Sequence, residues 1–245
     1  MEPAEPFYAL GQHFAIDLPG ARAAFSTRRG GHSTGPYESL NLGWLTDDDP
    51  RAVTRNRATL QDDLGAPPLS FVHQVHGAEV RRITHATSPA RERPRVDGQA
   101  TDRRDLALAA LVADCLPIAL AAPGRVAMLH AGWRGLATGM VAAGVAAMRA
   151  LGAGEELSAA IGPGAGPCCY EVGEEVHEPF TAIAEAHRGR NLDLKAIARH
   201  QLRAAGATAI ADIGICTICA DADLLFSHRR DQGVTGRQAG VAWLT

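Results

Sequence analysis

Residues 106–138 contain two short apolar runs, each closely followed by a residue that can carry chemistry. The first run, Leu106–Ala113, is followed by Cys115, and the second, Arg125–Leu129, by His130. Runs of this length are too short for good helices and predict buried strands. A Cys or His at the end of a buried strand is held on a rigid element. We therefore expect this stretch to form the centre of the fold and to carry a functional site.

A third residue of this kind lies upstream, in the segment Phe71–Gly77. The segment contains His73 and His76, which would point to opposite faces of a strand, so we do not expect one site to use both. His76 is the better candidate because it stands at the predicted strand end, directly before a glycine. Two His and one Cys are the ligands of a catalytic zinc with an open fourth position. The competing interpretations are a buried apolar Cys115 and a core His130.

The remainder of the chain alternates predicted strands and helices, which favours an α/β fold with a mixed sheet. Asp49-Pro50 is a typical helix start, and a glycine follows the predicted end of several helices, such as Gly65 after residues 51–64. Helices are predicted over residues 51–64, 136–151, 170–180 and 194–205. Further strands are predicted over residues 22–27, 70–76, 79–84, 157–161, 207–214, 224–228 and 239–244.

Two segments predict irregular structure within what we expect to be a single domain spanning residues 1–245. Residues 1–20 are Pro-rich and predict an irregular arm, and the polar residues 85–95 predict a loop.

The amino-acid composition is that of a globular protein, with 46% apolar and 21% charged residues. A formal charge of −3 gives no electrostatic case for binding nucleic acid or an anionic membrane. No apolar run reaches membrane-spanning length and no secretory signal is recognisable, so we expect a cytoplasmic location.

The five cysteines are an odd number, which fits a reducing compartment better than a complete disulfide framework. Cys216 and Cys219 have the C-x-x-C spacing of zinc ribbons and redox motifs, but no second C-x-x-C follows. Cys168 and Cys169 are adjacent, which makes them poor joint ligands. From spacing alone, structural or incidental roles for these four residues are favoured over a second metal site.

Six motifs occur along the chain in a fixed order: TRRGGHSTGPYESLNLG (27–43), QVHG (74–77), ADCLPI (113–118), HAGWRG (130–135), IGPGAGPCCYEVG (161–173) and SHRRD…TGR (227–237). Together they resemble the YfiH-like family, whose members are named laccase-domain proteins, polyphenol oxidases, purine nucleoside phosphorylases or peptidoglycan-editing factors. The resemblance covers nearly the whole chain. It implies a layered α-β-β-α arrangement and assigns the metal to His76, Cys115 and His130.

The resemblance also implies the activity. It indicates a zinc-dependent purine nucleoside phosphorylase with adenosine deaminase and methylthioadenosine phosphorylase activity, acting on purine nucleosides and phosphate. One alternative is a copper polyphenol oxidase, since two His and one Cys near Met128 could imitate a blue-copper centre. A multicopper laccase needs many more His, usually in HxH pairs, and none of the ten His forms one. The other alternative is a hydrolase that edits peptidoglycan precursors with Cys115 as nucleophile, paired with His76 or His130.

Arginine is the expected orienting group for a phosphate substrate, because its planar guanidinium binds phosphate bidentately. Arg134, Arg229, Arg230 and Arg237 all stand in glycine-rich or polar motifs rather than on predicted helix faces. We predict that Arg229 or Arg230 takes part in catalysis and that Arg134 contacts substrate. The resemblance adds Asn41 as a further substrate contact, on a loop that reaches the active site.

Overall fold

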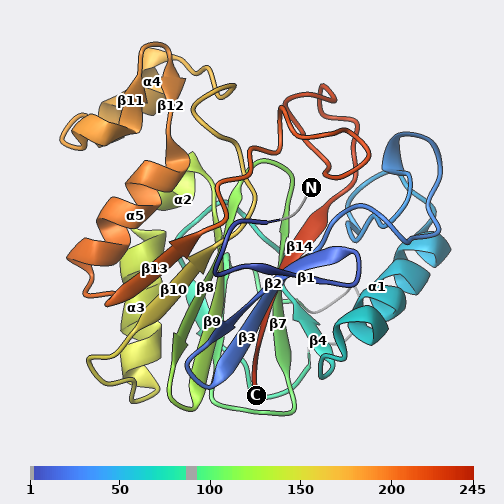
Figure 1. The fold of residues 1–245 in the computed structure, drawn as a ribbon, viewed down its shortest axis with the longest axis horizontal. Coiled ribbons are helices and arrows are strands. Elements are labelled where there is room, and N and C mark those ends of the chain that lie inside the picture. The colour runs from blue at the N-terminus through green and yellow to red at the C-terminus, as the bar shows by residue number, and fades with distance from the viewer. Residues whose placement is uncertain (1–2, 87–92) are drawn as a thin grey trace.

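The structure, a computed structural model that describes residues 3–86 and 93–245, has four layers in the order α-β-β-α (Figure 1). Two six-stranded sheets form the middle layers, with strand orders β1-β2-β3-β14-β7-β4 and β13-β10-β8-β9-β6-β5. The predicted α/β class with mixed sheets and its layered arrangement are therefore confirmed. Residues 87–92 of the loop predicted over 85–95 lie outside the described residues.

Each sheet is mainly antiparallel with parallel pairs near its edges. The first sheet consists of β1 (Tyr8–Leu10), β2 (His13–Leu18), β3 (Ala21–Phe25), β14 (Gln238–Leu244), β7 (Ala107–Val112) and β4 (Leu69–Phe71). The second consists of β13 (Ala209–Asp212), β10 (Ser158–Ile161), β8 (Leu116–Ala122), β9 (Arg125–Ala131), β6 (Gly98–Thr101) and β5 (Val80–Arg82). Pairs β4·β7, β5·β6 and β10·β13 are parallel, so both sheets are mixed. A small hairpin, β11 (His187–Arg188) and β12 (Asn191–Leu192), lies outside them.

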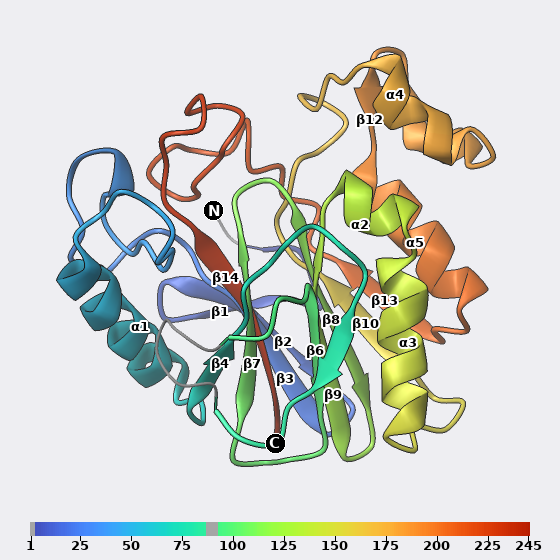
Figure 2. The ribbon, with the colours of Figure 1, turned by 180° about the vertical axis from the view of Figure 1, so that it is seen from behind.

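Helices cover the outer face of each sheet (Figure 2). Helix α1 (Pro50–Leu64) begins at the Asp49 cap, as predicted, and buries Leu60 and Leu64 against the first sheet. Helices α3 (Met140–Ala150) and α5 (Leu194–Ala204) cover the second sheet. Shorter helices complete the chain: α2 (Trp133–Ala137), α4 (Glu174–His177), and the 3-10 turns η1 (Gly35–Tyr37), η2 (Glu178–Phe180) and η3 (Ala184–Ala186).

The two sheets pack closely because small residues face one another between them. In β8, Leu116, Ile118 and Leu120 point toward the helices, whereas Ala119 and Ala121 point toward the other sheet. Gly240 of β14 lies in this interface: a Cβ there would lie 2.5 Å from Cβ of Pro117 and 3.1 Å from Sδ of Met128. The central strands predicted from residues 106–138 therefore form the interface between the sheets.

Several predicted elements are wrong or shorter than expected. The irregular arm predicted over residues 1–20 is wrong for residues 8–18, which contain β1 and β2 and bury Phe14 and Ile16 in the inter-sheet core; residues 1 and 2 of that prediction lie outside the described residues. The helix predicted over 136–151 is interrupted at Gly139, whose φ of +93° does not continue a helix. Residues 170–180 form only α4 and η2, and residues 224–228 form no strand.

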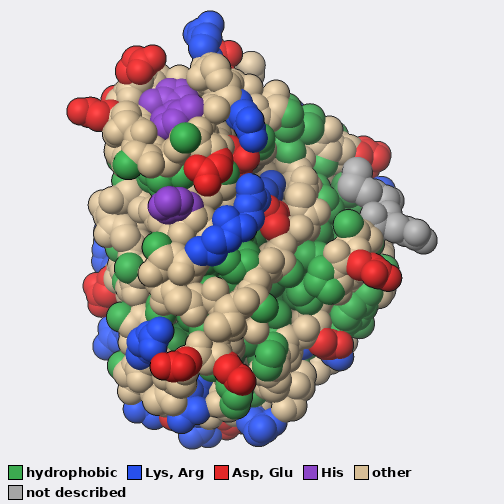
Figure 3. Space-filling model, turned by 60° about the vertical axis from the view of Figure 1, so that its left-hand side comes forward, with side chains coloured by type: hydrophobic (Ala, Val, Ile, Leu, Met, Phe, Trp, Pro, Cys, Tyr) green, Lys and Arg blue, Asp and Glu red, His purple; other side chains and the backbone are tan. Residues whose placement is uncertain are grey.

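Among the described residues, no helix combines the length and apolar character needed to cross a membrane. On the face shown in Figure 3, acidic and basic side chains lie interspersed rather than in a single basic surface. The predicted absence of nucleic-acid partners is consistent with this distribution and stays a prediction.

Gly240 provides a test of the close sheet packing. Gly240→Val should destabilise the protein by about 1–3 kcal/mol, since its side chain overlaps Pro117 and Met128 in a filled core. Equilibrium denaturation measures the change. Gly154→Ala is the matched control, because a Cβ at Gly154 meets no atom within 4 Å. Equal stability of the two variants would contradict the packing described.

Candidate active site

The register of the second sheet brings Cys115 to Gly132. Strands β8 and β9 pair antiparallel with Leu116 opposite Ala131, so the residue before β8 meets the residue after β9. A Cβ on Gly132 would lie only 2.7 Å from Sγ of Cys115 and 3.6 Å from Cδ2 of His76. Glycine at this position therefore leaves room for the sulfur and the imidazole to approach each other.

Asp97 holds the loop that carries His76. Its buried carboxylate accepts hydrogen bonds from the backbone N–H groups of Val75, His76 and Gly77, at 2.8–3.1 Å. The backbone of His76 is left-handed, with φ of +60°, and the strand predicted over residues 70–76 ends at Phe71. His73 and His76 are thus on a loop, and the opposite-face argument used to separate them does not apply.

The same carboxylate also orients His130. In the β6·β9 pair Gly98 lies opposite Leu129, which places Asp97 opposite His130. Nδ1 of His130 lies 2.8 Å from the Asp97 carboxylate, which leaves Nε2 to face the other ligand candidates. A carboxylate behind a histidine is the usual second partner of a metal-bound imidazole. Sequence reasoning missed Asp97; its signal was an acidic residue between Val96 and Gly98, at the start of a buried strand.

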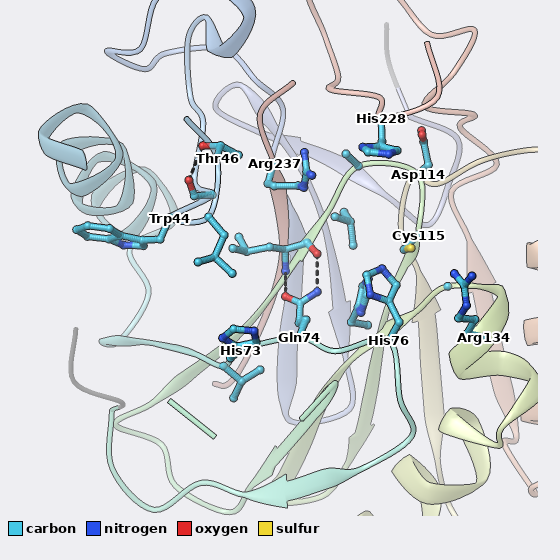
Figure 4. A pocket seen from close by; sticks show the side chains of 18 of the residues that line it. Trp44, Thr46, His73, Gln74, His76, Asp114, Cys115, Arg134, His228 and Arg237 are labelled. Carbon is cyan, nitrogen blue, oxygen red and sulfur yellow. Dashed lines mark hydrogen bonds between the residues drawn. The ribbon is translucent and has the colours of Figure 1, made fainter. Parts of the chain in front are cut away.

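His76, Cys115 and His130 form one cluster, as the sequence predicts. Figure 4 shows His76 and Cys115 side by side in the pocket. Their ligand atoms all lie within 4.8 Å of one another, and the two imidazole rings meet edge to face with centroids 4.9 Å apart. Ligand atoms of a tetrahedral zinc with nitrogen and sulfur donors are separated by about 3.3–3.8 Å. Two imidazoles and one thiolate therefore fit zinc, and the exposed side of His76 leaves a fourth position open to the pocket.

The cluster opens into a cavity of about 720 Å³. Aromatic side chains of Trp44, Trp133 and Tyr170 contribute to its wall, and Gln74 fixes the wall by exchanging two hydrogen bonds with the backbone of Leu111 (Figure 4). The cavity is strongly cationic, since its described lining includes one carboxylate, Asp114, and several guanidinium groups. The arginines that line it are Arg57, Arg93, Arg95, Arg134, Arg229 and Arg237.

Sequence and structure comparisons match this chain to known proteins over nearly its whole length. Residues 22–245 match the family model described as multi-copper polyphenol oxidoreductase laccase. The chain belongs to the YfiH-like, laccase-domain family. A Streptomyces coelicolor relative named purine nucleoside phosphorylase is 42% identical over 96% of this chain and 99% of its own. A Geobacillus stearothermophilus relative with the same name, YlmD, is 40% identical over 91% of this chain and 90% of its own.

Solved structures of the family agree with the fold. The crystal structure of Bacillus licheniformis YfiH has a TM-score of 0.89 and 31% identity, and the match covers 99% of this chain and all of the other. The crystal structure of Geobacillus stearothermophilus YlmD has a TM-score of 0.84 and 36% identity, covering 95% of this chain and 96% of the other. The names of the relatives support an enzyme within this laccase-domain family.

Of the four residues predicted to act in catalysis or to contact substrate, Arg134 and Arg229 line the cavity. Arg134 stacks on Trp133, and Arg229 lies over Tyr170 and donates to the carbonyl of Glu171. Sequence reasoning did not single out His228, which also lines the cavity. The other two predicted residues, Arg230 and Asn41, are not among the described residues that line the cavity.

Arg230 and Asn41 are instead committed to protein groups. The guanidinium of Arg230 binds the Asp231 carboxylate and the carbonyls of Thr217 and Leu225. Asn41 is fully buried, and its Oδ1 accepts the backbone N–H of Arg237 at 2.9 Å. Asn41 therefore supports the segment that brings Arg237 into the cavity, and the catalytic role of Arg230 and the substrate contact of Asn41 stay predictions.

In the metal-free chain, Cys115 and His130 form an ion pair. Burial raises the pKa of the Cys115 thiol, but the charge of His130 and hydrogen bonds from His130 and His76 outweigh it and lower the pKa to about 6. Burial lowers the pKa of His130, whereas the Cys115 thiolate and Asp97 raise it to about 9. Between these pH values the pair is a thiolate and an imidazolium. A thiolate is also the form of cysteine that binds a metal.

Alkylation of chelator-treated protein tests the ion pair. The rate at which iodoacetamide labels Cys115 should rise through about pH 6, because the thiolate is present above its lowered pKa. An unperturbed cysteine would show the same rise near pH 8.5. His130→Gln removes the cationic partner and should move the profile to higher pH. Peptide mass spectrometry resolves Cys115 from the other thiols, and an unshifted wild-type profile would contradict the geometry.

Asp97 can be tested separately through metal affinity. Asp97→Asn should weaken zinc binding about 10- to 100-fold, because the charge behind His130 is lost and the His76 loop keeps fewer hydrogen bonds. Competition with a zinc chelator measures the affinity. Asp102→Asn is the matched control, since Asp102 forms only a surface ion pair with Arg82 among the interactions described. The same affinity in both variants would refute the role assigned to Asp97.

Proposed function

We propose that the protein is a zinc-dependent purine nucleoside phosphorylase that also deaminates adenosine and cleaves methylthioadenosine. The observation that carries this proposal is a three-ligand cluster with an open position at the base of a cavity lined by six arginines. The names of the relatives, purine nucleoside phosphorylase at about 40% identity, support the phosphorylase activity. The deaminase and methylthioadenosine activities rest on the family resemblance.

Arginine side chains provide the binding site for phosphate in this proposal. In Figure 4, Arg134 and Arg237 lie to either side of Cys115, and Arg229 lines the same cavity. Arg237 is the most enclosed of them: burial lowers its pKa, while the negative charges of Cys115 and Asp114 oppose that effect. Its guanidinium is held by the carbonyls of Thr235 and Gly236, so it presents a fixed positive charge to an anion. Fixed charges of this kind stabilise a transferring or attacking phosphate.

The aromatic wall provides a binding site for a purine. Tyr170 and Trp133 lie beside the cluster, and a purine base stacks on aromatic rings through its flat face. A cavity of about 720 Å³ is within the range of small-ligand sites, about 300–1,000 Å³. A nucleoside could therefore place its base against this wall while its ribose faces the arginines.

His76, Cys115 and His130 would hold the zinc in this proposal. Zinc bound there would supply Lewis acidity and lower the pKa of a water, which suits attack at C6 of adenosine with release of ammonia. Asp97 keeps His130 in the tautomer that presents Nε2 to the cluster. For phosphorolysis, the arginines orient phosphate toward C1′ of the ribose, so that the C1′–O bond to phosphate forms as the bond to the base breaks.

Copper chemistry has less support from the geometry. Met128, the one candidate for a weak axial ligand, is buried between the sheets beside Gly240 and is not among the cavity-lining residues described. Within residues 3–86 and 93–245, groups of three or more clustered metal ligands occur at two places, neither of which has the many His that a trinuclear copper centre requires.

A second candidate function rests on one specific observation. Cys115, His130 and Asp97 stand in the order nucleophile, base and orienting carboxylate, which is also the arrangement of a cysteine hydrolase. Such an enzyme could remove a wrongly added amino acid from a peptidoglycan precursor. Iodoacetamide labelling of Cys115 in the presence of zinc distinguishes the two functions. Bound zinc protects Cys115 if its thiolate is a ligand and does not protect it if Cys115 is a nucleophile.

Product analysis tests the proposed function. Adenosine and phosphate should yield adenine and ribose 1-phosphate, with inosine as the deamination product, as resolved by chromatography. His76→Ala should lose the zinc of the three-ligand cluster and at least about 100-fold in turnover, since it removes one of the three ligands of that ion. His73→Ala is the matched control, because His73 lines the same cavity outside the cluster and should retain zinc. Intact adenosine together with rapid turnover of phenols or cell-wall precursors would reject the proposal.

A further inference from the structure

A second group of cysteines gathers outside the cavity. Cys168 and Cys169 lie on the loop after β10, and Cys216 and Cys219 on the loop after β13. Strands β10 and β13 are parallel neighbours, so both loops leave the same edge of the sheet. All four Sγ atoms lie within 4.8 Å of one another. The adjacent pair Cys168-Cys169 and the C-x-x-C segment, which spacing in the sequence did not connect, therefore form one cluster.

The sulfur positions fit a single tetrahedral ion. Sγ of Cys168 lies 3.5 Å from Sγ of Cys219 and 3.6 Å from Sγ of Cys169. A disulfide requires about 2.05 Å. Four thiolates around zinc at about 2.3 Å are separated by about 3.8 Å in a regular tetrahedron. An iron–sulfur cluster separates its thiolates further, because several iron atoms lie between them.

The backbone of both loops is arranged for this convergence. The N–H of Gly166 donates to Sγ of Cys216 at 3.2 Å, and Gly164 exchanges backbone hydrogen bonds with Ile215 and Thr217 across the two loops. A Cβ on Gly166 would lie 3.0 Å from Cβ of Cys216 and 3.4 Å from Sγ of Cys168. A tight turn after Gly166 directs the adjacent Cys168 and Cys169 to the same point, which overcomes the objection that adjacent residues make poor joint ligands.

A buried cation compensates the charge of the cluster. Lys195 is 4% exposed, and its Nζ donates to the carbonyls of Gly164 and Ile215, which stand directly beside the ligand loops. Burial lowers the pKa of the Lys195 ammonium, and the nearby groups that oppose this effect include Asp212, Cys216 and Cys168. Four thiolates around a divalent cation carry a net charge of −2, and a nearby ammonium stabilises that charge.

We propose that Cys168, Cys169, Cys216 and Cys219 bind a second zinc ion, as a closed structural site distinct from the His76–Cys115–His130 cluster. Binding releases the thiol protons and leaves no open position, so the site performs no chemistry on substrate. It instead joins the two loops that form part of the cavity wall. Thr217, inside the C-x-x-C segment, donates to the Asp114 carboxylate at 2.6 Å, and Asp114 precedes Cys115.

Zinc content of paired variants tests this site. Cys115→Ser should retain about one zinc per chain, because the four-cysteine site is untouched. Adding Cys219→Ser should remove that zinc. Metal analysis of purified full-length protein gives both values. Cobalt substitution of the single variant Cys115→Ser adds a spectroscopic test that requires no change in the four cysteines: four thiolates should give intense sulfur-to-cobalt charge-transfer bands.

Three results would overturn the proposal. The first is that Cys115→Ser binds neither zinc nor cobalt. The second is a disulfide among the four cysteines in non-reduced peptide mapping. The third is iron in the four-cysteine site. The outcome is independent of the proposed enzymatic function. If the three-ligand cluster bound no metal, wild-type protein and Cys115→Ser would both retain one zinc, and the variant with Cys219→Ser would still retain none.

Discussion

The buried carboxylate of Asp97 is the interaction on which the candidate active site depends. It binds three consecutive backbone N–H groups of the His76 loop and the imidazole of His130. Burial alone would raise its pKa, but the hydrogen bonds with His130 and those backbone groups lower it below the usual value, so the group is anionic. A fully paired buried charge fixes its partners strongly, because leaving any of them unpaired is costly.

The sheet register explains why these partners meet. Strand β9 pairs antiparallel with both β6 and β8. This pairing brings Asp97, His130, Gly132 and Cys115 together at the same end of these strands. A slip of one residue would turn each side chain to the opposite face. Small residues between the sheets hold the register by allowing close packing, and the rigid strands in turn position ligands for a metal.

The concentration of arginines on the wall makes the cavity electropositive. Arginines concentrate on the cavity wall although the chain as a whole has a formal charge of −3. A local concentration of charge in a low-dielectric cavity acts more strongly than the same charge on an open surface. Of the two cysteine-containing clusters, the His76–Cys115–His130 cluster lines the cavity, and the four-cysteine cluster lies where the loops after β10 and β13 meet.

Local sequence patterns alone predicted the ends of α1, the central apolar strands, and Cys115 and His130 of the candidate metal cluster. They also pointed to His76, but by a strand-end argument that does not apply, since His76 lies on a loop. Caps, periodicity and strand-end chemistry are local, so a linear sequence reports them. Tertiary structure decided the rest: Asp97 as the shared anchor, β1 and β2 in place of an arm, and the meeting of Cys168 with Cys219. Those features depend on which strands become neighbours and in which register, and residues 51 positions apart carry no local signal of their contact.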